Sequence, residues 1–305
     1  MSNVDASDSA AQGLTRLNRW KACGGFFEQY THPSSSTNTV MRFTVYFPPQ
    51  SAHKPVPVLY FLSGLTCTDE NVVQKGFVQS QAAKRGLAVV CPDTSPRGAG
   101  VDGEDESWDF GTGAGFYVDA TASKWSRHYN MFTYVTQELP AILHRHFPTA
   151  LLPDARSICG HSMGGHGALV CAMKTFLSQG GPPYKSVSAF APIAHPTACP
   201  WGQKAFGGYL EGDQGAGNAG EGWDATLLME REGPFPFPLL VDQGTADTFL
   251  EGQLMPEALE KACASKGQDA TIRRQDGYDH SYFFISTFMA DHIDFHANAL
   301  GLPRE

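Results

Sequence analysis

Short continuous runs of apolar residues alternate along this chain with stretches in which apolar residues recur every three or four positions. The continuous runs are rich in valine, leucine and phenylalanine, which is typical of strands buried on both faces of a parallel sheet. They are Val58–Leu62, Leu87–Cys91, Ser157–Cys159, Val187–Phe190 and Leu239–Val241. Thr271–Arg274 would be one further strand near the sheet edge.

The N-terminal part of the chain has a different pattern. Met41–Phe47 alternates apolar and polar residues with a period of two, as a half-buried antiparallel strand should. Leu14–Gly24 and Phe26–His32 meet at the glycine pair Gly24 and Gly25, which predicts a hairpin that turns there.

Amphipathic stretches between these runs predict helices. The predicted helices are Phe77–Arg85, Met131–His146, Gly164–Leu177, Leu254–Ser265 and Ser281–Ala299. Strands that alternate with helices predict right-handed crossovers and a mainly parallel central sheet, so the fold class is α/β.

The chain has 305 residues, a length that one large α/β domain can reach. Residues 1–12 are rich in Ser, Ala and Asp, and we expect them to form a flexible tail. No break in composition divides residues 13–305, which we therefore predict to be a single domain. The glycine-rich stretch Gly207–Gly222 is expected to be a surface loop.

Charge and composition exclude several classes of function. Acidic residues outnumber basic ones 31 to 22, and Lys and Arg do not cluster, which argues against nucleic-acid binding. The longest apolar stretch, Val56–Cys67, is interrupted by polar residues and is too short to span a membrane. The seven cysteines are widely spaced without a C-x-x-C pair, and the N-terminus is polar and acidic. We therefore expect reduced thiols and a cytoplasmic location.

The sharpest chemical signal is the sequence GHSMG at residues 160–164, which has the form G-x-S-x-G. An apolar strand leads into it and a helical pattern follows, which is the setting of a nucleophile elbow. Flanking glycines permit the tight turn, and the positive end of the helix favours an oxyanion. Ser162 is the candidate nucleophile of an α/β-hydrolase fold, with helices on both faces of its sheet. A glycine-rich turn without chemistry is the alternative.

A serine hydroxyl needs a base, and the base needs an acid that orients it. In this fold the acid and the histidine follow the serine, each in a turn after a strand. Asp247 follows the last continuous apolar run, and His280 ends the turn after Thr271–Arg274. These positions predict a catalytic set of Ser162, Asp247 and His280. Asp242 competes for the acid role but lies too early, on the strand itself.

The oxyanion needs two backbone N–H donors, one from the residue after the nucleophile and one from the loop after an earlier strand. We assign these donors to Met163 and Leu65, because Gly64 lets the loop approach the substrate. Cys67 lies in the same loop, either as a small buried side chain or as a modifiable thiol beside the site.

The remaining histidines have simpler interpretations. His161 and His166 flank the nucleophile, and we expect them to be packed there. His292 and His296 lie four residues apart on the last predicted helix, which is a possible spacing for a metal pair. With no third ligand in view, a packed or solvated face is the preferred interpretation, and no metal is predicted.

Longer motifs make the chain similar to a known family. They are SGLTCTDEN at 63–71, PDTSPRG at 92–98, GAGFYVDAT at 113–121, GHSMGGHGAL at 160–169, SAFAPI at 188–193, PWGQKAFGGYL at 200–210, DQGTADTFL at 242–250 and GYDHSYFFI at 277–285. These segments resemble the S-formylglutathione hydrolase family, the esterase D group. The similarity runs from about Leu14 to Leu302, and the family's triad falls on Ser162, Asp247 and His280.

The resemblance implies a cytoplasmic serine thioesterase that releases formate and glutathione in formaldehyde detoxification, without metal or cofactor. Its expected partner is a small glutathione thioester. A homodimer is the candidate assembly. The resemblance also places Trp201 and Phe116 near the mouth of the site. One alternative is a broad carboxylesterase for short acyl esters that uses the same triad. Another is a catalytically silent scaffold or acyl-carrier binding protein on a hydrolase fold.

Overall fold

The computed structural model describes residues 13–181, 183–211 and 220–303. The predicted tail, residues 1–12, lies outside the described residues, as does the middle of the glycine-rich stretch, residues 212–219. Within the described ranges, no helix is both long enough and apolar enough to cross a membrane.

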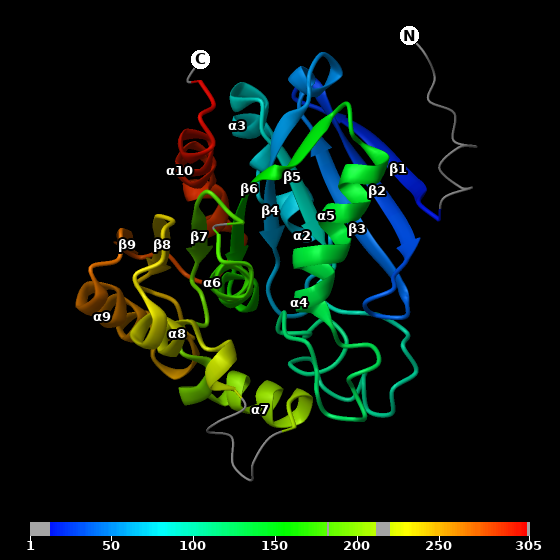
Figure 1. Ribbon diagram of the computed structural model, residues 1–305. Coiled ribbons are helices and arrows are strands. Elements are labelled where there is room, and N and C mark those ends of the chain that lie inside the picture. Colours follow the sequence, from blue (N-terminus) through cyan, green and yellow to red (C-terminus); the bar gives the residue numbers. More distant parts are fainter. Residues whose placement is uncertain (1–12, 182, 212–219, 304–305) are drawn as a thin grey trace.

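Nine strands form one mixed sheet in the order β1-β2-β3-β5-β4-β6-β7-β8-β9 (Figure 1). The strands are β1 (Thr15–Ala22), β2 (Gly25–Pro33), β3 (Val40–Phe47), β4 (Val56–Leu62), β5 (Ala88–Pro92), β6 (Leu151–His161), β7 (Val187–Phe190), β8 (Leu239–Gly244) and β9 (Ala270–Gln275). The pairings of β1 with β2, β2 with β3 and β3 with β5 are antiparallel, and the others are parallel. Every strand predicted from the apolar runs is present.

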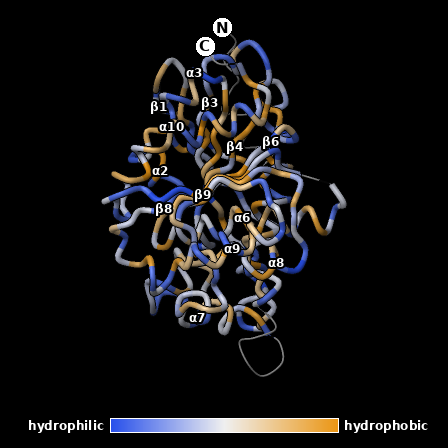
Figure 2. Tube along the Cα trace, turned by 90° about the vertical axis from the view of Figure 1, so that its left-hand side faces the viewer, coloured by the Kyte–Doolittle hydropathy of each residue, from blue (hydrophilic) through white to orange (hydrophobic). Residues whose placement is uncertain are grey.

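Helices cover both faces of this sheet. On one face α3 (Val78–Arg85) packs against α10 (Tyr282–Ala299), and the Arg85 guanidinium lies 2.9 Å from the Asp294 carboxylate. On the other face lie α5 (Leu139–His146), α6 (Met163–Gln179), α8 (Ala225–Glu232) and α9 (Pro256–Lys266). Figure 2 shows the two layers on either side of the apolar central strands.

Three helices of the described residues were not predicted, and three expectations were wrong in part. The missed helices are α2 (Asn71–Lys75), α7 (Pro200–Tyr209) and α8. The predicted helix over 131–146 is interrupted by a π-helical turn at Tyr134–Glu138, between α4 (Met131–Thr133) and α5. Pro140 has no N–H to donate to residue 136, so the regular ladder cannot continue through it.

The expected loop at Gly207–Gly222 begins inside a helix. Helix α7 continues through Gly207 and Gly208 to Tyr209, and Glu221–Trp223 forms a short 3-10 turn. A Cβ atom on Gly208 would overlap with the Phe110 ring, which itself stacks on Tyr209 with ring centres 4.4 Å apart. Close packing against Phe110, and not a loop, accounts for the glycine at position 208.

Strand β3 is more buried than its alternating pattern predicts. Thr44 and Tyr46 lie on the face that should be solvated, yet both are fully buried. The Thr44 hydroxyl donates to the Asp69 carboxylate at 2.7 Å, and the Tyr46 hydroxyl donates to the Ala22 carbonyl at 3.2 Å. Hydrogen bonding therefore makes polar groups compatible with burial on this face.

The edge strand β1 is exposed along nearly its whole length. It carries Arg16, Arg19 and Lys21 on one short segment, and both arginines lie within ion-pair distance of Glu28 on β2. Leu17 and Trp20 of the same strand are also exposed.

A chain of buried polar side chains runs from the end of β8 to the last helix. Arg273 and His292 both donate to the Asp242 carboxylate, at 2.5 and 3.1 Å. The His292 Nδ1 accepts from Ser188 at 2.8 Å, and Ser188 in turn lies 2.7 Å from His296 Nε2. His296 Nδ1 then contacts Ser186 at 2.8 Å, and Ser186 contacts Ser157 at 2.8 Å.

Each hydrogen bond in this row of side chains has one donor and one acceptor when both histidines are neutral. Burial lowers the pKa of His292 and of His296, so each ring carries one proton, which Nε2 donates. Every donor then points toward Asp242. Burial alone would raise the pKa of Asp242, but the bonds from His292 and Arg273 hold it well below its usual range. His292 and His296 are thus packed side chains, and no group of His, Cys, Asp or Glu arranged to hold a metal ion is found in the described part of the chain.

We predict that Asp242→Asn destabilises the protein without removing its chemistry. The substitution leaves a buried hydrogen-bond chain without its charged acceptor, and such losses cost about 3–5 kcal/mol of unfolding free energy. Urea denaturation of the variant and the wild type measures the difference, and activity measured below the unfolding transition should stay near the wild-type value. Equal stability of the two proteins would contradict this assignment.

We also predict that the unfolding free energy decreases as the pH falls below about 6.5. His292 and His296 have lower pKa values in the folded protein than the ordinary 6.5, so the unfolded chain binds more protons in that range. Their contribution is fully present above pH 6.5 and is lost at up to about 1.4 kcal/mol per pH unit for each histidine. Urea denaturation at pH 7, 6 and 5 measures the slope, which His296→Gln should reduce. An unfolding free energy independent of pH in this range would refute the prediction.

Candidate active site

Ser162 occupies a sharp turn between strand and helix. Strand β6 ends at His161 and helix α6 begins at Met163, so Ser162 alone forms the connection. Its φ of 57° and ψ of −119° are strained for a residue with a side chain. Three backbone hydrogen bonds hold it: Ser162 N–H donates to Phe190 at 2.9 Å, and its carbonyl accepts from His166 at 3.0 Å and Ile193 at 3.2 Å.

Glycines make this turn possible. A Cβ atom on Gly160 would overlap with the Gly164 carbonyl, and one on Gly164 would overlap with the Leu62 carbonyl at the end of β4. A Cβ on Gly64 would lie 3.1 Å from the Ser162 Cβ. The loop after β4 therefore lies directly beside the predicted nucleophile.

The structure brings Asp247 and His280 together across two turns. Asp247 follows β8 and His280 precedes α10, and the Nδ1 of His280 lies 2.6 Å from the Asp247 carboxylate. The Asp247 side chain is fully buried and also accepts from Phe249 N–H at 2.9 Å and Gln243 Nε2 at 3.2 Å. These bonds fix the carboxylate, which in turn keeps the histidine proton on Nδ1 and leaves Nε2 free to act as a base.

The residue before Ser162 brings the serine near the Asp247–His280 pair. His161 precedes Ser162, and its ring centre is 4.5 Å from that of His280. No hydrogen bond between Ser162 and His280 is present among the described residues, and such contacts are often long in ligand-free enzymes. Asp242 is engaged with Arg273 and His292, so its carboxylate faces away from this pair.

The two proposed oxyanion donors are backbone N–H groups for which the described residues provide no acceptor. Met163 is the first residue of α6, so its N–H has no acceptor within the helix. The Leu65 N–H has no acceptor among the described contacts. The positive end of the α6 dipole adds to the attraction for a negatively charged oxygen.

Aromatic side chains line one side of His280. The Phe249 ring centre is 5.1 Å from that of His280, and Trp201 packs on Phe249 at 4.8 Å. Trp108, which is 58% exposed, contacts Trp201 edge-on at 5.8 Å. Sequence reasoning included Trp201 but missed Phe249, although Phe249 lies only two residues after Asp247.

Phe116 and Cys67 occupy different positions from Trp201. Phe116 is fully buried, its carbonyl accepts from His166 Nε2 at 3.0 Å, and its ring lies 6.1 Å from the His166 ring and 6.4 Å from the Phe206 ring. Burial raises the pKa of the Cys67 thiol, which disfavours the reactive thiolate at neutral pH. A regulatory role for Cys67 stays a prediction.

His161 and His166 are both buried beside the nucleophile. Burial lowers the pKa of His166 to about 4 and that of His161 well below its usual value. Both rings are therefore neutral at physiological pH, and neither adds a positive charge next to Ser162.

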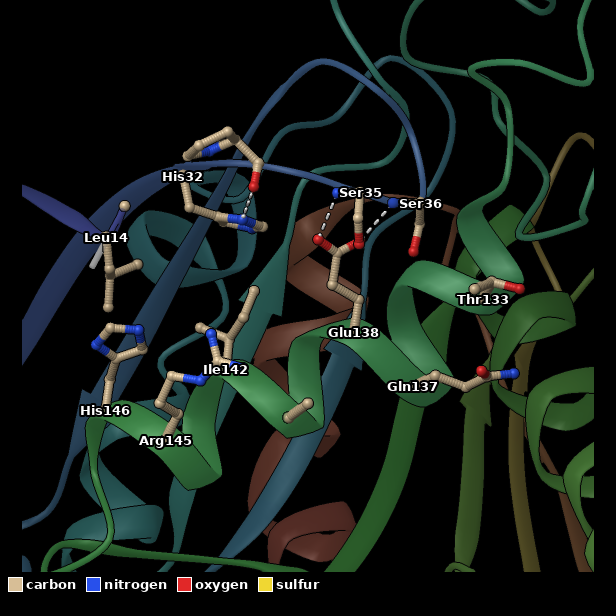
Figure 3. A pocket seen from close by; sticks show the side chains of 13 residues that line it. Leu14, His32, Ser35, Ser36, Thr133, Gln137, Glu138, Ile142, Arg145 and His146 are labelled. Carbon is tan, nitrogen blue, oxygen red and sulfur yellow. Dashed lines mark hydrogen bonds between the residues drawn. The ribbon is translucent and has the colours of Figure 1, made fainter. Parts of the chain in front are cut away.

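A separate hollow lies between the β2–β3 turn and α5 (Figure 3). Glu138 accepts there from the Ser34 hydroxyl and from the N–H groups of Ser35 and Ser36, each at 2.8 Å. None of the predicted site residues lines this hollow. It is distinct from the candidate active site.

Comparison with known proteins agrees with this geometry. Residues 34–295 match the family described as "Putative esterase". The chain is 48% identical to the S-formylglutathione hydrolase of Rattus norvegicus, over 94% of this chain and 99% of that protein. It is 52% identical to the S-formylglutathione hydrolase of Paracoccus denitrificans, over 92% of this chain and 96% of that protein.

A solved structure extends the likeness to three dimensions. The S-formylglutathione hydrolase of Agrobacterium tumefaciens superposes with a TM-score of 0.86 at 47% identity, covering 94% of this chain and 99% of that one. Identity this high over nearly the whole chain, on the same fold, shows that the chain belongs to the S-formylglutathione hydrolase family of esterases.

Proposed function

We propose that this protein is a serine thioesterase that hydrolyses S-formylglutathione to formate and glutathione. The observation that carries the proposal is the buried Asp247–His280 pair at 2.6 Å, next to a serine in a strained strand–helix turn. The names of the relatives supply the substrate class. Ser162 as nucleophile, His280 as base and Asp247 as orienting acid are the roles that we assign.

The reaction proceeds in two steps. His280 Nε2 removes the proton from Ser162 as its oxygen attacks the thioester carbonyl, and the N–H groups of Leu65 and Met163 bind the resulting oxyanion. The tetrahedral adduct collapses, expelling glutathione as a thiolate, which leaves readily and takes the proton from His280. The formyl group remains on the serine as an ester.

Water completes the cycle. His280 removes a proton from the water as it attacks the formyl-serine carbonyl, and the same two N–H groups bind the second oxyanion. Collapse of this adduct returns the proton from His280 to Ser162 and releases formic acid, which loses its proton to water and becomes formate. Asp247 stays ionised and stabilises the imidazolium in both steps. Neither a metal ion nor an organic cofactor is needed for this chemistry.

We further propose that the reaction serves formaldehyde detoxification in the cytoplasm. All seven cysteines are free thiols, and five of them are buried: Cys91, Cys159, Cys171, Cys199 and Cys263. Free thiols suit a reducing compartment.

The second candidate function is a carboxylesterase for short acyl esters, which uses the same residues on another leaving group. The observation that favours it is exposed Trp108, which contacts Trp201 and so continues the row of aromatic side chains from Phe249 toward the surface. Such a surface can accept apolar leaving groups.

We predict that kcat/KM falls steeply from formyl to acetyl to butyryl thioesters of glutathione. Phe249 packs against His280 and Trp201 packs against Phe249, so we expect each added methylene to displace packed side chains. Overpacking costs about 1–3 kcal/mol, which corresponds to roughly fivefold to 150-fold in kcat/KM at each step. Steady-state hydrolysis of the three thioesters, with p-nitrophenyl acetate beside them, measures the series. A flat or rising series would make the short-acyl carboxylesterase the better description.

We predict that Asp247→Asn lowers kcat by about 10⁴, because an amide at this position favours the wrong histidine tautomer. Asp242→Asn is the matched control, since Asp242 is a buried aspartate near the same strand end but binds Arg273 and His292 instead. Steady-state kinetics and circular dichroism on both variants provide the comparison. A large loss in the Asp242 variant, with Asp247→Asn near wild type, would reverse the assignment.

A further inference from the structure

One buried side chain holds the loop that carries Leu65. The Tyr117 hydroxyl donates to the Ser63 carbonyl at 2.9 Å, and both residues are fully buried. Ser63 is the residue that follows β4, two positions before the proposed oxyanion donor. Tyr117 belongs to a segment about fifty residues farther along the chain, and none of the catalytic roles assigned above uses it.

Three hydrogen bonds surround the Leu65 peptide. Tyr117 holds the Ser63 carbonyl on one side, and the Cys67 N–H donates to the Gly64 carbonyl at 3.3 Å. On the other side the Thr66 N–H donates to the Gly113 carbonyl at 2.9 Å. The Gly64 carbonyl and the Leu65 N–H belong to the same peptide plane, so orienting one orients the other. Only the Tyr117 bond of the three comes from a side chain.

Tyr117 is itself held by the helix that begins at the nucleophile. His166 on α6 donates from Nε2 to the Phe116 carbonyl at 3.0 Å, and a Cβ on Gly167 would overlap with the Tyr117 ring. Phe116 and Tyr117 both have left-handed φ angles, 48° and 51°. Two consecutive non-glycine residues in this region are strained and persist only where surrounding contacts impose them.

We propose that Tyr117 is a positioning residue for oxyanion stabilisation. Helix α6 supplies one donor directly, through Met163, and fixes the direction of the other through His166, Gly167, Tyr117 and Ser63. The two donors are thereby held in one geometry by one helix. This inference rests on the serine-hydrolase chemistry of the proposed function, including the role of Leu65, but not on the identity of the thiol.

The size of the effect follows from the geometry. Removing an oxyanion donor outright costs about 10²–10³ in kcat. Tyr117→Phe retains the Leu65 N–H and its two backbone restraints, so the loss should be smaller, roughly tenfold to hundredfold in kcat. The ground-state carbonyl depends much less on this geometry, so KM should change by about twofold at most.

The test compares Tyr117→Phe with the wild type on two substrates and one inhibitor. S-formylglutathione and p-nitrophenyl acetate should lose the same factor in kcat, because their oxyanions share the same donors. Phenylboronic acid forms a tetrahedral adduct with the serine. Its inhibition constant should rise in the variant while KM stays constant. A wild-type kcat, or a loss confined to KM, would overturn the proposal.

Tyr184→Phe is the matched control. Tyr184 is also fully buried, but its hydroxyl has no hydrogen-bond partner among the described residues, and it packs on Tyr60 at 6.5 Å, away from the loop. Its activity and boronic acid affinity should match those of the wild type. If Tyr184→Phe showed the same kinetic loss as Tyr117→Phe, the effect would be one of general packing and the proposal would be wrong.

A second variant keeps the inference testable if Tyr117→Phe does not fold. The added methyl group of Gly167→Ala displaces the Tyr117 ring from the side of helix α6. The folded fraction of this variant should show the same loss in kcat at constant KM. A folded Gly167→Ala with full kcat would count against the proposal. Failure of the proposed function looks different. If the wild type is inactive on S-formylglutathione but active on p-nitrophenyl acetate, only the assigned substrate is wrong. If the wild type reacts with neither substrate nor a fluorophosphonate, the assigned serine chemistry is wrong.

Discussion

The close backbone contact between the end of β4, the end of β6 and the start of α6 is the constraint on which the site depends. Gly160 and Gly164 leave no room for side chains at this crossing. Ser162 is forced into a left-handed conformation there, and the loop after β4 is brought against it. The predicted nucleophile and the loop that carries the proposed donor Leu65 therefore share one junction, and the strain in the serine is maintained by the sheet on one side and the helix on the other.

The molecule contains a second set of serine, histidine and aspartate that has no access to substrate. Ser188, His292 and Asp242 form a hydrogen-bonded row at 2.8 and 3.1 Å, but all three are fully buried. In this row the aspartate binds Nε2, whereas Asp247 binds Nδ1 of His280. Residue types and distances alone therefore do not define a catalytic triad. The strained strand–helix turn at Ser162 and the nearby N–H groups of Met163 and Leu65 distinguish the proposed catalytic set from this structural one.

Much of this arrangement follows from local sequence patterns. Continuous apolar runs predicted the parallel strands because those strands are buried on both faces. The strand order pointed to Asp247 and His280, which the structure brings within 2.6 Å of each other. The pattern could not predict α7, because Gly207 and Gly208 resemble a loop until the packing against Phe110 is known. Phe249 and Tyr117 were missed for a similar reason, since their roles come from contacts made across the fold and not from spacing along the chain.

The exposed edge strand β1 limits how two copies of the protein could associate. An open edge offers unpaired backbone groups to any neighbouring strand, and such edges are prone to aggregation. Pairing β1 with its counterpart would place rows of Arg16, Arg19 and Lys21 from both copies side by side, with Glu28 already engaged by the two arginines of its own chain. Like charges opposite each other destabilise strand pairing. The basic residues thus disfavour pairing between two β1 strands at the open sheet edge of this net acidic protein.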